Sequence, residues 1–163
     1  MFEGKLVGIY TTSEAGTPMQ PRDEVEAITG VGLAGDRYGV GAGKFSEREG
    51  TGRQVTLIER EAVAAVNAEG DVTVGEQETR RNLVTEGVPL NHLVDRTFRI
   101  GDVVMRGKRL AEPCAYLASL TTPGVSRALV HRAGLRAEVL TGGVLHVGDV
   151  VALAEQTAGL PTG

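Results

Sequence analysis

The sequence is poor in several residue types, and each shortage excludes a class of protein. It has one cysteine, so it can form no internal disulfide and cannot supply the thiolates of an iron–sulfur cluster. It has no tryptophan, three tyrosines and three phenylalanines, and its net charge is -4. Few aromatic rings and a negative charge argue against a protein that binds nucleic acid.

Long hydrophobic runs are also missing. The sequence has no run of about 18 apolar residues, and its N-terminus lacks a basic segment followed by an apolar core. These absences predict a cytoplasmic protein with no membrane partner. At 163 residues the chain fits one domain. We expect that domain to span residues 1–154, with residues 155–163 as a flexible C-terminal tail.

Glycines and short valine-rich runs characterise the rest of the chain. The 23 glycines separate these runs, a pattern typical of short strands joined by tight turns. Phe98–Met105 and Leu145–Ala152 share the pattern apolar-Gly-Asp-Val-Val, which predicts a similar turn into a strand at two corners of a barrel. We predict a mainly β protein, with strands at Lys5–Tyr10, Val103–Met105, Ala137–Leu140 and Val150–Leu153.

A first helix is indicated after Arg53-Gln-Val. Thr56 and Glu59 have the spacing of a capping box, which predicts a helix from Thr56 to about Asn67, ended by Gly70. Its apolar residues would share the face that packs on the sheet. These residues are Ile58, Ala62, Val63 and Val66.

A second helix is expected nearer the C-terminus. Thr122 and Pro123 form a typical helix start, and Gly134 a typical end. Three apolar residues of this helix would point inward: Val125, Leu129 and Val130. A shorter turn is expected at residues 89–93.

A glycine-rich segment and three histidines do not form a familiar site. In Gly39–Ser46, a phosphate-binding loop would need glycine and serine or threonine where Tyr38 and Phe45 stand, so we predict a mobile loop and no ATP site. The histidines show no metal-binding spacing, and structural roles are the better interpretation. They are His92, His131 and His146.

Polar residues interrupt a strand-like run at Arg80-Arg81-Asn82. On an extended strand, Arg80 and Asn82 would face the same side and Arg81 the other. A guanidinium beside an amide suits a phosphate or the edge of a heterocycle. An exposed strand end with solvated arginines explains the pattern equally well.

The single cysteine, Cys114, follows Glu112 and Pro113. Pro113 restricts its own backbone and favours an extended Glu112, so we expect Cys114 on a stiff strand exit. From the residues alone, Cys114 is a buried hydrophobic side chain, a nucleophile, a sulfur carrier or a soft metal ligand. Converging arginines would favour its thiolate.

The order of several short motifs resembles a MOSC domain, the module found at the C-terminus of molybdenum cofactor sulfurases. The resemblance covers about residues 3–154. It is carried by six elements: Gly35-Asp36-Arg37-Tyr38, Arg53-Gln-Val-Thr56, Arg81-Asn82-Leu-Val-Thr85-Glu-Gly87-Val, Phe98-Arg-Ile-Gly101-Asp102, Glu112-Pro-Cys114 and Gly142-Gly143-Val-Leu-His-Val-Gly148-Asp149-Val.

The resemblance implies a compact β-barrel-like domain with two or three short helices packed on it, and a bound molybdenum cofactor. Cys114 would be the catalytic residue and the sulfur ligand to molybdenum, or the sulfur acceptor in sulfurase relatives. Arg80 and Asn82 match an Arg-x-Asn element that holds the pterin and its phosphate, and Arg53 is a weaker candidate. Many members have Glu where this chain has Arg81, which would then be an additional anion contact or a surface residue.

The activity implied for stand-alone members is reduction of N-hydroxylated compounds. One cysteine is too few for an iron–sulfur cluster, so electrons would come from a separate reductase. A sulfur transferase that carries a persulfide on Cys114 is the alternative, and a non-catalytic cofactor-binding module is the second. Pyridoxal phosphate belongs to the desulfurase half of full-length sulfurases, which this chain lacks, so it is not expected here.

Overall fold

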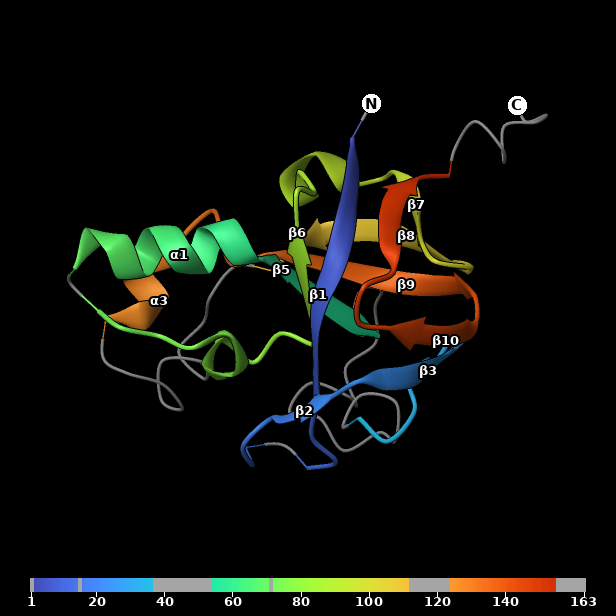
Figure 1. Cartoon of the computed structure of the whole chain (residues 1–163), viewed down its shortest axis with the longest axis horizontal. Coiled ribbons are helices and arrows are strands. Elements are labelled where there is room, and N and C mark those ends of the chain that lie inside the picture. Colours follow the sequence, from blue (N-terminus) through green and yellow to red (C-terminus); the bar gives the residue numbers. More distant parts are fainter. Residues whose placement is uncertain (1, 15, 37–53, 71, 112–123, 155–163) are drawn as a thin grey trace.

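Seven strands close into a β-barrel in the computed structural model, which describes residues 2–14, 16–36, 54–70, 72–111 and 124–154 (Figure 1). They pair in the order β1, β6, β5, β9, β8, β7, β11, and β11 pairs back with β1. β5 and β6 run parallel, and the other neighbours run antiparallel. The predicted mainly β, barrel-like fold is therefore confirmed. The strands are β1 (Glu3–Thr11), β5 (Val55–Glu59), β6 (Leu83–Glu86), β7 (Thr97–Ile100), β8 (Val103–Leu110), β9 (Leu135–Thr141) and β11 (Val150–Leu153).

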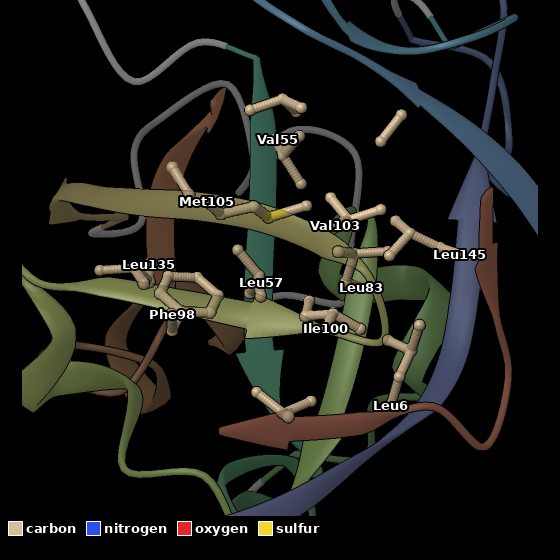
Figure 2. Close-up of a cluster of buried hydrophobic side chains, with 14 of the residues drawn as sticks. Leu6, Val55, Leu57, Leu83, Phe98, Ile100, Val103, Met105, Leu135 and Leu145 are labelled. Atoms are coloured by element: carbon tan, nitrogen blue, oxygen red, sulfur yellow. The ribbon is translucent and has the colours of Figure 1, made fainter. Parts of the chain in front are cut away.

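A smaller sheet accompanies the barrel. It consists of β10 (Gly143–His146), β3 (Glu24–Ile28) and β4 (Gly32–Leu33), while β2 (Gln20–Arg22) pairs with the end of β1. Large apolar side chains fill the barrel interior (Figure 2), and many of them have no exposed surface, such as Leu6, Leu57 and Phe98. Functional groups are therefore to be sought at the strand ends and outside the barrel.

The two similar segments form similar corners, as predicted. Gly101 lies between β7 and β8 with φ 58°, and Gly148 lies between β10 and β11 with φ 104°. Both values fall in the left-handed region that favours glycine. The Gly101 N–H also donates to the Val150 carbonyl at 2.9 Å. This bond joins the first corner to β11, the strand that follows the second corner.

The first helix begins later than predicted. Thr56 lies inside β5, and α1 spans Arg60–Glu69. The capping-box interpretation was wrong because the Thr56 hydroxyl donates to Asn82 on the neighbouring strand at 3.2 Å. The predicted end is confirmed, since Gly70 terminates the helix with φ 85°.

The second helix is shorter than predicted. The α-helical part, α3, spans Val125–Ala128, and Val130 is 46% exposed, so its predicted inward direction was wrong. Leu129 is buried as expected. The predicted start at Thr122 and Pro123 lies outside the described residues.

Two short 3-10 helices complete the described structure. η2 (Leu90–Leu93) confirms the turn expected at residues 89–93, whereas η1 (Glu76–Thr79) was not predicted. α1 and α3 lie on one side of the barrel (Figure 1). Between them and the barrel is an apolar cluster that includes Ile58, Val66 and Leu129. No helix in the described part of the chain is long and apolar enough to cross a membrane.

The Glu59 carboxylate links the start of α1 to η2. It accepts a hydrogen bond from the Leu90 N–H at 3.1 Å. Burial raises the pKa of Glu59 above its ordinary value of 4.5, against the smaller lowering effect of this bond. The folded state thus favours the protonated form. Its contribution to the free energy of unfolding is complete below pH 4.5 and is lost as the pH rises through the folded-state pKa.

Glu59→Gln removes this titration and keeps an oxygen acceptor for Leu90. As the pH rises above 4.5, we expect the free energy of unfolding of the variant to increase relative to that of the wild type. Urea denaturation at a series of pH values measures the difference. Glu61→Gln is the control, because the exposed Glu61 accepts the Gly87 N–H at 2.9 Å in the same region. A constant difference between Glu59→Gln and wild type would contradict the expectation.

Candidate functional site

Arg80 lies at the end of η1 and not on a strand. Its φ is 62°, in the left-handed region, and β6 begins only at Leu83. The expected alternation of Arg80, Arg81 and Asn82 along an extended strand was therefore wrong. The Arg80 side chain is 8% exposed, and its Nη1 donates to the Thr17 carbonyl at 2.8 Å.

Side chains on β1 and α1, together with bonds inside the turn, hold η1 in place. Glu76 accepts bonds from Arg60 Nε at 2.5 Å and Nη2 at 3.2 Å, and from the Tyr10 hydroxyl at 3.4 Å. Burial, followed by the charge of Glu76, raises the pKa of Tyr10, so the phenol remains a donor at neutral pH. Thr79 adds a bond from Oγ1 to the Glu76 carbonyl at 2.7 Å. These contacts fix the turn that ends at Arg80.

Arg80 lines a cavity of about 280 Å³. The cavity lies between η1 and the loop after β1. The remaining lining residues are Gly16, Pro18, Met19, Gln77 and Glu78. A guanidinium at this wall suits an anion, because it offers several N–H donors in one plane and no acceptor.

Asn82 joins three strands. Its Oδ1 accepts from Thr56 N at 3.1 Å and Thr56 Oγ1 at 3.2 Å, and its Nδ2 donates to the Tyr10 carbonyl at 3.1 Å. The side chain has no exposed surface. Asn82 thus ties β5 and β1 to the start of β6.

Arg81 is buried and forks between two carbonyl groups. Its Nε donates to the Ala133 carbonyl at 2.8 Å, and its Nη2 donates to the Ala111 carbonyl at 2.6 Å. The residue is 7% exposed, so the surface alternative was wrong. Ala111 also donates its N–H to the Gly134 carbonyl at 2.8 Å. Arg81 therefore joins the two ends of the segment that connects β8 to β9.

Two of the predicted site residues, Cys114 and Arg53, lie outside the described residues, as does the loop Gly39–Ser46. Their roles stay predictions. Within the described ranges, no group of three histidine, aspartate or glutamate side chains is placed to hold a metal ion.

One buried acid, Asp36, was not among the predicted site residues. Asp36 has no exposed surface, and its Oδ1 accepts the Thr12 N–H at 3.2 Å. The Thr12 and Thr17 hydroxyls bond to each other, and Thr17 in turn receives Arg80 through its carbonyl. The sequence signal was present, since Asp36 belongs to one of the six motif elements.

Comparison with solved structures shows the same fold in bacterial proteins. The YuaD protein from Bacillus subtilis is similar with a TM-score of 0.72 and 19% identity, covering 93% of this chain and 97% of that one. YiiM from Geobacillus stearothermophilus gives 0.68 and 15%, covering 96% and 77%. YiiM from Escherichia coli gives 0.63 and 18%, covering 91% and 69%. At these identities the likeness concerns the fold alone. No curated protein sequence matches significantly.

A sequence profile described as MOSC domain matches residues 43–152, more than half of the chain. The match contains five of the barrel strands and all but the last residue of β11, together with the segment Arg80-Arg81-Asn82 and Cys114. The family is associated with the molybdenum cofactor. By this match the chain belongs to the MOSC domain family.

Proposed function

We propose that this chain binds the molybdenum cofactor and reduces N-hydroxylated compounds, with Cys114 as its sulfur ligand to molybdenum. The observation that carries the proposal is the fork of Arg81. It ties Ala111 to the segment that also holds Arg80. Ala111 precedes Cys114 by three residues, a span of about 11 Å at most. Arg81 thus holds the last described residue before the Glu112-Pro-Cys114 element.

The donors in this region support an anionic cofactor. Arg80 brings a guanidinium to the wall of its cavity, which suits the phosphate of the pterin. Asn82 keeps its amide oxygen on Thr56, so we assign it to holding the Arg80 segment in place. Arg81 holds Ala111, the last described residue before Cys114, and Arg53 remains a further candidate for the cofactor.

When bound, the cofactor would supply two-electron redox chemistry. In the proposed reaction, R–NHOH takes up two electrons and two protons, its N–O bond breaks, and R–NH2 and water form. The electrons would come from a separate reductase, since the sequence offers neither a cysteine set for a cluster nor a dinucleotide-binding fingerprint. Arg80 would hold the anionic end of the cofactor, and Cys114 would ligate its metal.

Metal analysis of protein made in a host that assembles the cofactor tests this proposal. We expect molybdenum near one equivalent in the wild type and its loss in Cys114→Ala. Arg80→Ala should retain less molybdenum than the wild type, because an anion contact is removed. Arg99→Ala is the matched control, since Arg99 is an exposed arginine on β7, and its molybdenum content should not change.

Other outcomes would reject the proposal in distinguishable ways. A metal-free wild type with a cyanide-labile sulfur on Cys114 would indicate a sulfur transferase. Protein with neither property would be a non-catalytic module. Molybdenum-loaded protein that fails to reduce an N-hydroxylated amidine with reduced viologen as electron donor would reject the reductase and keep the cofactor.

A further inference from the structure

A second cavity, of about 710 Å³, lies between α1 and the segment around α3. Its volume falls in the range of about 300–1,000 Å³ that is usual for small-molecule sites. Arg80, Arg81 and Asn82 do not line it, so the function proposed above leaves it unexplained.

One side of this cavity is apolar. Val66 of α1 is 1% exposed and belongs to the apolar cluster, against which Val72 and Ala128 also pack. Val130, by contrast, is 46% exposed and lines the same cavity. A hydrocarbon or aromatic group placed here would bury valine surface that now faces water.

The rim of the cavity is basic. Glu69 is its acid. The bond from Arg132 Nη2 at 2.7 Å lowers the pKa of Glu69 and so keeps its carboxylate ionised, and the charge of Arg132 balances that of the carboxylate. Arg132 also donates from Nε to the Ala128 carbonyl at 2.7 Å, so it is held against the protein. Arg127 is exposed, and the described residues offer it no hydrogen bond or ion pair. Arg127 is thus the cation available to a ligand.

The walls are pre-formed by unusual backbone. His131 has φ 66°, which is uncommon for a residue other than glycine, and its carbonyl accepts Asn91 Nδ2 at 2.9 Å. Gly124 has φ 92°, and a Cβ there would lie 2.8 Å from the Val72 side chain. A ligand would therefore meet a largely prepared site, which reduces the cost of ordering it.

We propose that this cavity binds a small amphipathic carboxylate, with its apolar body against Val72 and Val130 and its carboxylate on Arg127. The site needs neither molybdenum nor Cys114. It is a binding site in addition to the function proposed above.

Titration of metal-free protein with 4-phenylbutanoate, followed by calorimetry and NMR, tests this site. We expect saturable binding, with shifts confined to α1, Val72 and residues 124–132. Arg127→Ala and the neutral probe 4-phenylbutanamide should each weaken binding about fivefold to tenfold. Ala128→Phe, which fills the cavity, should abolish binding while the fold is kept, as circular dichroism would show.

Two matched variants separate this site from the cofactor site. Arg99→Ala removes an exposed arginine elsewhere, and Arg80→Ala removes the proposed anion contact of the cofactor, so both should bind the probe as the wild type does. No saturable binding, equal affinity for the two probes, or unchanged binding in Arg127→Ala would each overturn the proposal. Because the protein is metal-free, none of these results depends on the molybdenum analysis.

Discussion

Replacing Arg81 with glutamine is expected to lower the free energy of unfolding by about 3 kcal/mol. Arg81 supplies a charged donor to the carbonyls of Ala111 and Ala133, and both of these residues are buried. A hydrogen bond to a charged group contributes about 1.5–3 kcal/mol, and a buried carbonyl that loses its partner pays a desolvation penalty. Glutamine is too short to reach both carbonyls. Urea denaturation measures the loss.

Three further variants separate the charge from the planar fork. Arg81→Lys keeps the charge and should recover part of the loss. Arg81→Glu would face two carbonyl oxygens with a carboxylate and should be less stable than Arg81→Gln. Arg109→Gln changes an exposed arginine on β8 and should stay within about 0.5 kcal/mol of wild type. Wild-type stability in Arg81→Glu would show that the two carbonyls do not depend on Arg81.

Four of the strands were predictable because their pattern is local. Ala137–Leu140, and Lys5–Tyr10 as far as Gly8, alternate between buried and more exposed residues, with Leu6 and Ala137 in the core. Such alternation follows from the backbone of a single strand, without knowledge of its partners. The order in which the strands pair depends on contacts far apart in sequence. The repeated Gly-Asp corners suggested a barrel and the family resemblance implied one, but neither gave the strand order.

The start of α1 was not predictable from spacing because β5 is buried on both faces. Leu57 points into the barrel, while Ile58 packs in the cluster beneath α1. A continuous apolar run of this kind reads equally well as helix or strand. The hydroxyl of Thr56 then bonds across to Asn82, a partner that the local sequence does not reveal.

The candidate site was predictable in residue type but not in geometry. The sequence singled out Arg80, Arg81 and Asn82, and all three are buried. Their partners lie 63 residues away for Arg80, and 30 and 52 residues away for Arg81. The left-handed backbone at Arg80 also breaks the extended geometry on which the strand argument relied. Roles that depend on such distant contacts could be assigned only once the fold was known.

Gly134→Ala is expected to lower the free energy of unfolding by about 4 kcal/mol or to prevent folding. Gly134 has φ 113°, and a Cβ there would lie 1.8 Å from the Leu57 carbonyl oxygen. Leu57 cannot retreat easily, because β5 pairs through it with both Leu83 and Leu135. The same glycine accepts the Ala111 N–H, so the change would also disturb the anchor of Arg81.

Gly30→Ala separates steric clash from backbone strain at Gly134. Gly30 has φ 74°, and a Cβ there would meet no atom within 4 Å. Alanine at this position should therefore lower the free energy of unfolding only by the strain of left-handed backbone, about 1–2 kcal/mol. Urea denaturation of both variants measures the difference, which reports the clash with Leu57. If the two alanines cost the same, β5 yields at Leu57, and the close approach of Gly134 to the Leu57 carbonyl is not what requires glycine at this position.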